Sequence, residues 1–400
     1  MMNASIGLRT RNMIPIFLVY ILFPSELGLF QFGSSLGINY GQVANNLPSP
    51  TEVVSILGSL QVTKTRIYDT NPQVLTAFAN SGIELIVTVP NDQVASMMNP
   101  SQSLQWISTN VKPYLPATRI TGIAVGNEVY TTDDDTLKAN LVPAMVSMHS
   151  TLVQLGLDSY IHITTAASLA VLETSFPPSM GSFKPELAPQ MSQFLSFLAQ
   201  TKAPFWINAY PYFAYKDDPN RIELNYVLFN PNNGTVDPYT HLHYDNMLYA
   251  QVDAVTFAMA RLGFGNIPVQ VSETGWPSKG DTNEIGATIA NARVYNRNLL
   301  VRQLKCEGTP VRPNQKLEVY LFALFNENLK PGPTSERNYG LYRPDGTVAY
   351  NLGLTSLSTA STASISLTSS ASPEKPSGIR VDSSGTKLIN NIYRSEKYDH

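Results

Sequence analysis

Short apolar segments rich in β-branched residues recur along the chain from Leu36 to Glu327, separated by longer and more polar stretches. Near-continuous apolar runs of this length are typical of parallel strands that are buried on both faces. The pattern therefore predicts eight such strands. They are Leu36–Tyr40, Lys64–Asp69, Glu84–Pro90, Ile120–Glu128, Ile161–Ser168, Phe205–Phe213, Pro268–Trp276 and Leu317–Glu327.

Segments with helical character lie between the predicted strands. Asp135–Gly156 repeats apolar residues on one helical face, and its final glycine is a stop signal. Tyr244–Gly263 has the same character, and Ala287–Leu304 is a further segment of this kind. Strand and helix alternating eight times predict an α/β fold, namely a single-domain (β/α)8 TIM barrel.

The N-terminal residues resemble a targeting signal. Arg9 and Arg11 precede the apolar run Met13–Phe23, which is too short to span a membrane and fits the core of a secretory signal peptide. We place the cleavage near residues 33–35, so that residues 1–34 form the signal peptide. The alternative is a retained N-terminal anchor. We expect a secreted protein, located extracellularly in the cell wall or apoplast, with no stable membrane span in the mature chain.

The composition changes after Leu354. Residues 355–400 begin with a Ser/Thr-rich stretch low in aromatic residues, which cannot bury enough apolar surface to fold. We expect a disordered C-terminal tail that is a candidate for O-glycosylation. Within the remaining residues, 35–354, the sequence "NGT" at Asn233 is an N-glycosylation acceptor in a secreted protein.

Composition argues against several classes of function. The 400 residues are 43% hydrophobic, enough for a large core, and the net charge of −3 gives no reason to expect a nucleic-acid partner. Cys306 is the single cysteine, so no intrachain disulfide can form, and we expect it to be inert. The five histidines show no metal-ligand spacing, with His241 and His243 as a weak alternative. We expect a monomer without metal or cofactor.

Glutamates stand at the ends of three predicted strands, at Glu128, Glu273 and Glu327. In a barrel of this kind the carboxyl ends of the strands face the active site. An ionised acid beside apolar residues is costly unless it is paired, hydrogen-bonded or used, and a structural carboxylate remains the alternative. Two convergent carboxylates without a metal or a catalytic Cys or His suit glycoside hydrolysis.

Five segments at the predicted strand ends narrow this hypothesis. They are "GINYGQVANNLPSP" (Gly37–Pro50), "VGNEV" (Val125–Val129), "NAYPYF" (Asn208–Phe213), "VSETGWPSKG" (Val271–Gly280) and "FALFNENLKPGPTSERNYGLY" (Phe322–Tyr342). In this order they resemble the motifs of the plant β-1,3-glucanases, family 17 of the glycoside hydrolases. The resemblance implies a catalytic domain over residues 35–354. It also implies a retaining endo-hydrolase of β-1,3-glucosidic bonds, with a β-1,3-glucan such as callose or fungal-wall glucan as substrate.

The resemblance implies a role for each of four residues. Glu273 matches the family's nucleophile, and Glu128 matches its acid/base. Asn127 matches a residue expected to hydrogen-bond the sugar 2-hydroxyl, and Tyr210 should orient Glu273. Glu273 must be ionised to attack, whereas Glu128 must start protonated, so its surroundings should raise the pKa of Glu128. In retaining enzymes the two carboxyls lie roughly 5–5.5 Å apart.

Five further residues match positions that we interpret as substrate-binding. Tyr40 and Trp276 are expected to be platforms on which sugar faces stack, with core packing as the alternative for each. Glu327, Lys330 and Glu336 match a charged cluster of the family. We interpret these three as substrate contacts or as neighbours that tune the pKa of the catalytic acids.

Three other functions share parts of this pattern. A non-catalytic glucan-binding protein would keep the fold, but it would not need both acids. A transglycosylase would use the same glycosyl-enzyme intermediate and exclude water. A barrel glycosidase that cuts β-1,4-glucan or mannan would share the two glutamates, and only the family motifs argue against it.

Overall fold

The computed structural model of the chain describes residues 37–352. The predicted signal peptide, residues 1–34, and the predicted tail, residues 355–400, lie outside the described residues. Their boundaries therefore stay predictions.

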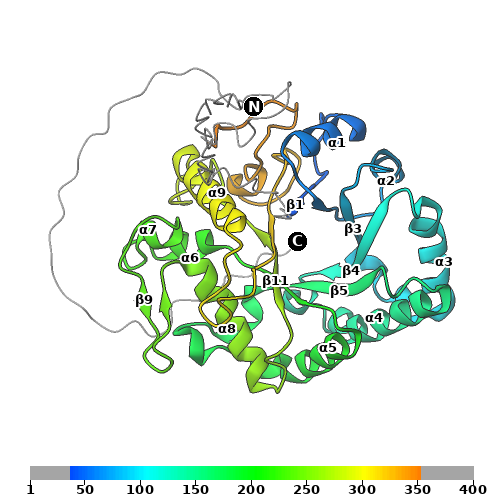
Figure 1. The fold of residues 1–400 in the computed structure, drawn as a ribbon, viewed down its shortest axis with the longest axis horizontal. Coiled ribbons are helices and arrows are strands. Elements are labelled where there is room, and N and C mark those ends of the chain that lie inside the picture. Colours follow the sequence, from blue (N-terminus) through cyan, green and yellow to red (C-terminus); the bar gives the residue numbers. More distant parts are fainter. Residues whose placement is uncertain (1–36, 353–400) are drawn as a thin grey trace, which may run out of the picture. The chain divides into compact units, whose positions relative to one another are not determined.

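Eight parallel strands close into a barrel in the order β1-β12-β11-β8-β5-β4-β3-β2 (Figure 1). Neighbours in this order follow one another along the chain, apart from two small hairpins, and helices surround the strands. The prediction of a single-domain (β/α)8 TIM barrel is confirmed. The barrel strands are β1 (Gly37–Asn39), β2 (Lys64–Arg66), β3 (Glu84–Val89), β4 (Arg119–Asn127), β5 (His162–Ser168), β8 (Phe205–Asn208), β11 (Val269–Thr274) and β12 (Val319–Leu321).

The outer layer is helical, and its longest helix shows how the sequence sets the ends. Asp134 accepts the backbone N–H of Leu137 at 2.9 Å and caps α4, and Gly156, with a φ of 69°, terminates it. The α-helices are α1 (Pro50–Ser59), α2 (Pro72–Ala77), α3 (Pro100–Asn110), α4 (Asp135–Leu155), α5 (Ala188–Thr201), α6 (Pro211–Asp217), α7 (Leu224–Val227), α8 (Met247–Arg261) and α9 (Ile289–Leu304).

Shorter elements fill the connections between strands and helices. Two hairpins pair β6 (Leu172–Thr174) with β7 (Ser182–Phe183), and β9 (Thr235–Val236) with β10 (His243–Tyr244). The 3-10 helices are η1 (Asn91–Gln93), η2 (Ser96–Met98), η3 (Lys112–Tyr114), η4 (Val129–Thr131), η5 (Leu169–Val171), η6 (Pro178–Met180), η7 (Pro185–Leu187) and η8 (Thr334–Arg337).

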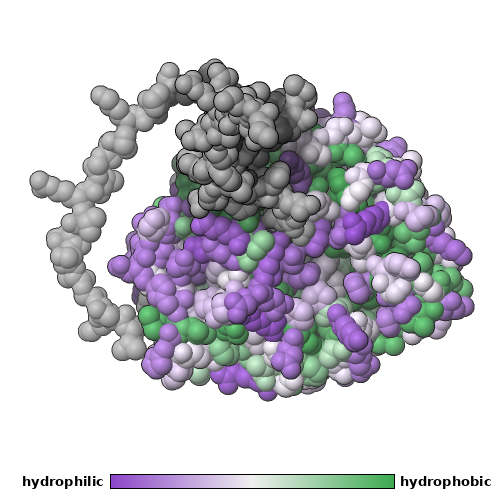
Figure 2. Space-filling model, viewed as in Figure 1, coloured by the Kyte–Doolittle hydropathy of each residue, from purple (hydrophilic) through white to green (hydrophobic). Residues whose placement is uncertain are grey.

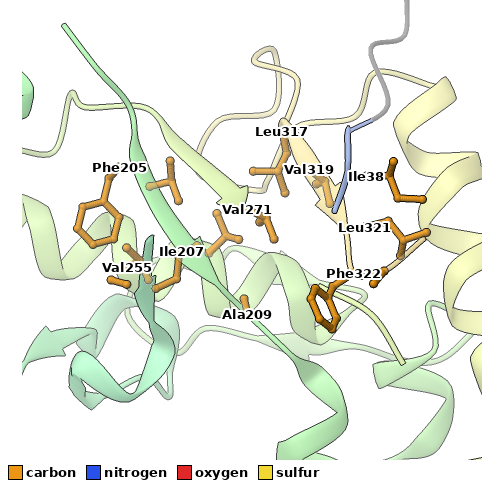
Figure 3. Close-up of a cluster of buried hydrophobic side chains, with 14 of the residues drawn as sticks. Ile38, Phe205, Ile207, Ala209, Val255, Val271, Leu317, Val319, Leu321 and Phe322 are labelled. Atoms are coloured by element: carbon orange, nitrogen blue, oxygen red, sulfur yellow. The ribbon is translucent and has the colours of Figure 1, made fainter. Parts of the chain in front are cut away.

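Successive side chains of β8 point to opposite sides of the barrel wall, and so belong to two different layers of the core. Phe205 and Ile207 belong to the apolar layer between the strands and the helices (Figure 3), whereas Trp206 belongs to a small cluster inside the barrel. Asn208 is the next residue of the inner face. The predicted strand Phe205–Phe213 stops there, because Pro211 begins α6. The inner face of β8 thus delivers an amide to the mouth of the barrel.

The predicted eighth strand is shorter than its apolar run. β12 ends at Leu321, and Glu327 lies in the following loop, so the prediction that Glu327 ends this strand is wrong. Beyond Leu321 the chain still bonds to both neighbouring strands, since the N–H of Phe322 donates to the carbonyl of Thr274 at 2.7 Å and that of Leu324 donates to the carbonyl of Asn39 at 2.9 Å. A later segment also pairs with it, where the N–H of Leu341 donates to the carbonyl of Ala323 at 3.0 Å. These contacts bury the apolar residues that follow the regular strand.

Hydrophilic residues are spread over the described surface seen in Figure 2, with apolar residues between them. Of the helices in residues 37–352, none is long and apolar enough to cross a membrane.

Trp276 lies in the core and not at a binding surface. Its side chain is 0% exposed, and its ring centroid lies 5.2 Å from that of Tyr212 and 5.5 Å from that of Tyr295. The indole N–H donates to the carbonyl of Gly286 at 2.8 Å. An enclosed indole has no free face for a sugar, so the expectation that Trp276 is a stacking platform is wrong.

Replacing Trp276 with Leu is expected to lower the free energy of unfolding by about 2–4 kcal/mol, because a cavity opens among the tyrosines and the Gly286 carbonyl keeps only the donor from Asn291. Chemical denaturation followed by circular dichroism measures this change. Tyr160→Leu is the control, since Tyr160 is 71% exposed and its loss should matter by less than about 0.5 kcal/mol. Equal unfolding free energies for the two variants would contradict the core position of Trp276.

Candidate active site

Glu273 is a buried carboxylate held by three donors. Its Oε1 accepts from Nη1 of Arg66 at 3.1 Å and from the hydroxyl of Tyr68 at 2.8 Å, and its Oε2 accepts from the hydroxyl of Tyr210 at 2.8 Å. The predicted contact from Tyr210 is therefore present. Three donors stabilise the ionised form and fix the orientation of both oxygens.

A β-bulge in β11 aims this carboxylate. Val271 pairs with Ile207 of β8, and Glu273 pairs with Asn208, so two steps along β11 match one step along β8. Ser272 is the extra residue. Bulges beside active sites redirect the side chains that follow them, and here the bulge comes directly before Glu273.

Arg66 and Tyr68 were missed in the sequence. Arg66 ends β2 with a side chain that is 0% exposed, and its Nη2 donates to Oδ1 of Asn127 at 2.7 Å. Its guanidinium carbon lies 4.6 Å from the ring centroid of Tyr68. Burial, and then the charge of Glu273, raise the pKa of Tyr68 well above its ordinary value, so Tyr68 stays a donor. One sequence feature could have indicated these two residues: an arginine stands two positions before a tyrosine, so both side chains lie on the same face of the predicted strand Lys64–Asp69.

Glu128 follows the last residue of β4 in a left-handed conformation, with a φ of 52°. Its backbone N–H donates to the carbonyl of Ala166 at 2.9 Å, which holds this conformation against its steric cost. Its Oε1 accepts from Nδ2 of Asn208 at 2.7 Å. Asn208 is a further functional residue that the sequence analysis did not single out, although it opens the segment Asn208–Phe213.

The surroundings of Glu128 favour its protonated form. Burial, and then the charge of Glu273, raise the pKa of Glu128 to about 7. The hydrogen bond from Asn208 opposes this shift, and the cations Lys330 and Arg66 oppose it as well. The expected raised pKa of Glu128 is therefore present. A raised pKa of this kind suits a group that has to donate a proton.

Asn127 is fixed from both sides and keeps one donor available. Its backbone N–H donates to Oδ1 of Asn91 at 2.7 Å, and Nδ2 of Asn91 donates back to its carbonyl at 3.1 Å. Arg66 occupies its Oδ1. No acceptor for its Nδ2 exists among the described residues, so this amide can donate to a ligand.

The structure brings the predicted charged cluster together. Nζ of Lys330 lies 3.0 Å from Oε2 of Glu336 and 4.6 Å from the ring centroid of Phe322. Burial opposes the charged form of Lys330, but the carboxylates of Glu336, Glu327 and Glu273 outweigh it and raise the pKa of Lys330. Lys330 is therefore a permanent cation beside the acids.

Glu327 is more enclosed than Glu336. It is 4% exposed, and its Oε1 accepts the backbone N–H of Val43 at 3.0 Å. Burial raises the pKa of Glu327, and the nearby charge of Lys330 acts against this. A Cβ on Gly41 would lie 2.3 Å from the carboxyl carbon of Glu327, so the glycine makes room for the acid.

Carboxylates of a second loop hold the segment that carries Glu336. The backbone N–H of Thr334 donates to Oδ2 of Asp281 at 2.9 Å, and that of Ser335 donates to Oε2 of Glu284 at 3.0 Å. The loop after β11 is thereby bonded to η8, which positions Glu336 for Lys330.

Tyr40 is buried like Trp276. It is 2% exposed, its ring centroid lies 5.9 Å from that of Phe325, and burial raises its pKa to about 12. Neither face of the ring is open, so the expectation that Tyr40 is a stacking platform is wrong. The described residues contain no group of three or more His, Cys, Asp or Glu that could hold a metal ion.

Comparison with known proteins gives the family. Residues 36–354 match the family described as "Glycosyl hydrolases family 17". Glucan endo-1,3-beta-glucosidase 11 of Arabidopsis thaliana is 54% identical over 322 residues, which are 80% of this chain and 76% of that protein. Glucan endo-1,3-beta-glucosidase 10 of the same plant is 52% identical over 334 residues, 83% of this chain and 79% of that protein.

The solved structures agree with this match. CJP38, a beta-1,3-glucanase and allergen of Cryptomeria japonica pollen, is 44% identical with a TM-score of 0.75, covering 78% of this chain and 97% of that one. A plant beta-glucan endohydrolase is 39% identical with a TM-score of 0.72, covering 78% and 98%. The match extends over the whole barrel and both glutamates at its mouth, and the chain belongs to family 17 of the glycosyl hydrolases.

Proposed function

We propose that this protein is a retaining endo-hydrolase of β-1,3-glucosidic bonds, with a β-1,3-glucan such as callose or fungal-wall glucan as its substrate. One observation carries the chemistry: Glu273 is held by three donors, whereas Glu128 has one amide donor and a pKa raised to about 7. This difference suits a nucleophile and an acid. The linkage follows from the family and from the names of its relatives.

In the first step, Glu273 attacks the anomeric carbon while the bond from that carbon to the glycosidic oxygen breaks. The carboxyl proton of Glu128 passes to this oxygen, so the leaving glucan departs as an alcohol. Arg66, Tyr68 and Tyr210 hold the carboxylate of Glu273 oriented for the attack.

In the second step, Glu128 is a carboxylate and takes a proton from water, whose oxygen attacks the same carbon and releases Glu273. The configuration is retained because it is inverted twice. We assign the available Nδ2 of Asn127 to the sugar 2-hydroxyl, a contact that strengthens in the transition state. Lys330 limits the electrostatic repulsion among the acids. Its positive charge acts against the rise in the pKa of Glu128 and of Glu327, although burial keeps both values raised.

We further propose that the protein is secreted and glycosylated at Asn233. The apolar run Met13–Phe23 supports secretion. Asn233 is exposed, and its side chain makes no hydrogen bond within residues 37–352. The neighbouring Asn232 donates to the carbonyls of Asn230 and Asp245 at 2.7 and 2.9 Å, so its amide is occupied. An accessible amide in Asn-Gly-Thr is the substrate that N-glycosylation requires.

The wild-type protein should cut laminarin internally and leave carboxymethyl-cellulose intact, and Glu273→Ala should lower the rate by roughly 10⁴-fold or more because no covalent intermediate can form. Release of reducing ends and analysis of product sizes measure both effects. Glu186→Ala, at an exposed acid in η7, is the control and should act like wild type. Binding without cleavage would favour the non-catalytic reading, and products longer than the substrate would favour a transglycosylase.

The kcat/KM for laminarin should fall as pH rises through about 7, because Glu128 must be protonated in the free enzyme and its pKa is raised to about 7. In Glu128→Gln, an aryl glucoside oligomer with a leaving group that needs no proton should be turned over without this alkaline limb. Initial rates between pH 4 and pH 9 measure both profiles. An alkaline limb that persists in Glu128→Gln would assign the acid to another residue.

Expression in a plant or yeast secretory host should yield protein in the medium that starts near residue 34 and carries a glycan at Asn233. Peptide mass mapping before and after enzymatic deglycosylation detects both. Thr235→Val should remove the glycan, whereas Thr235→Ser keeps the acceptor sequence and should retain it. A cell-associated protein with an intact N-terminus would support the retained anchor instead.

A further inference from the structure

A chain of hydrogen bonds connects Glu128 to the inner wall of the barrel. Nδ2 of Asn208 donates to Oε1 of Glu128 at 2.7 Å, and the hydroxyl of Ser272 donates to Oδ1 of Asn208, also at 2.7 Å. The carbonyl of Ser272 accepts from Nδ2 of Asn39 at 3.0 Å, so Ser272 is itself fixed. Ser272 and Asn39 are 0% exposed, and Asn208 is 3% exposed.

The bulge in β11 explains why a serine reaches Asn208. Ser272 is the extra residue between the pairs Val271–Ile207 and Glu273–Asn208. The bulge turns its hydroxyl toward the end of β8, and the next residue along the chain is the nucleophile. One irregularity therefore sets the partner of the acid/base and the direction of the nucleophile together.

We propose that Ser272 is a positioning residue for Glu128: its hydroxyl orients the amide of Asn208 so that Nδ2, and not Oδ1, faces the carboxyl of the acid/base. An amide presents a donor at one end and an acceptor at the other, and a donor bonded to the acceptor end leaves the NH₂ for Glu128. The proposal rests on the proposed role of Glu128.

Donation from Asn208 favours the ionised form of Glu128, so losing it should raise the pKa of Glu128 further. Without the Ser272 hydroxyl, Oδ1 of Asn208 is buried and unpaired, and the amide is free to turn. If Oδ1 then faced Glu128, it would accept a hydrogen bond from the protonated carboxyl, which stabilises the neutral form and also raises the pKa of Glu128.

The charged groups that face Glu128 are Glu273 of β11, Lys330 after β12 and Arg66 of β2. The Ser272 hydroxyl bonds to none of them. A change in the titration of Glu128 in Ser272→Ala therefore reports on the amide of Asn208.

The test is a carboxyl-carbon NMR titration of full-length protein labelled with ¹³C at its glutamates. The Glu128 signal is assigned by its loss in Glu128→Gln. In Ser272→Ala the midpoint of this signal should rise by roughly 1–2 pH units, the size expected from one hydrogen bond to a charged group. The alkaline limb of kcat/KM on laminarin should move upward by the same amount.

Thr274→Val is the matched control. Thr274 lies on the same strand, is also 0% exposed, and loses a comparable hydroxyl contact, the 2.6 Å bond with the hydroxyl of Tyr295. This control should lose stability to a similar degree without moving the Glu128 midpoint. Ser272→Cys, which keeps the volume with a weaker donor, should give an intermediate midpoint and serves if Ser272→Ala does not fold.

A double-mutant cycle identifies the route. In the Asn208→Ala background, Ser272→Ala should leave the Glu128 midpoint unchanged, because the amide through which it acts is gone. A midpoint that does not move in Ser272→Ala, or that moves equally with and without Asn208, overturns the proposal. The titration needs no turnover, so an inactive wild-type protein would sink the proposed function and leave this test readable.

Discussion

The buried pair of Arg66 and Glu273 is the interaction on which the rest of the site depends. The arginine is 0% exposed and the two side chains are 3.1 Å apart. Taking two charges out of water costs several kcal/mol each, and hydrogen bonds to the remaining groups of the pair offset part of this cost. The second NH₂ group of Arg66 donates to Oδ1 of Asn127. The hydroxyls of Tyr68 and Tyr210 donate to the carboxylate of Glu273. Residues from β2, β4 and β11 are thereby fixed by one cation, on the rigid inner wall of the barrel rather than on its loops.

The positive charges of the site lie at different distances from the two acids, Glu273 and Glu128. Glu273 has the arginine within bonding distance, whereas Glu128 has only the more distant charges of Lys330 and Arg66 to offset its burial. Two acids of the same type at one end of the same barrel therefore lie in different electrostatic surroundings. The loop that bonds Asp281 and Glu284 to η8 keeps Glu336 beside Lys330, so the cation that limits the repulsion is itself held in place.

The sequence predicts the barrel well because buried parallel strands need nearly continuous apolar runs, and each of the eight runs overlaps one of the barrel strands. It also predicts Glu128 and Glu273, since acids are conspicuous at apolar strand ends. Burial of aromatic rings is less predictable: Tyr40 and Trp276 stand in family motifs next to the site, yet their rings are enclosed by other aromatic residues that come from distant parts of the chain. Whether a ring at a strand end is enclosed in the core or exposed to substrate depends on the tertiary packing.

Partners that act through hydrogen bonds were missed for a related reason. Arg66 at the end of β2, Tyr68 just after it and Asn208 of β8 lie many residues from the acids to which they bond. Their roles depend on distances below 3.2 Å that no local pattern encodes. The sequence predicts Glu327 at a strand end because its apolar run continues past β12, where the chain is buried by irregular bonds to β1, to β11 and to the later segment around Leu341.

The register of β11 also limits where this chain can change its length. Side chains along a strand alternate between faces, so adding or removing one residue turns all later side chains to the opposite face. A residue added or removed earlier in β11, between Val269 and Val271, would shift Glu273 by one position against β8 and turn its carboxyl away from Arg66. Loops such as the hairpin at β9 are free of this parity. The barrel can therefore gain or lose length at its rim during divergence, whereas β11 before its bulge tolerates exchange of residues but not single-residue insertion or deletion.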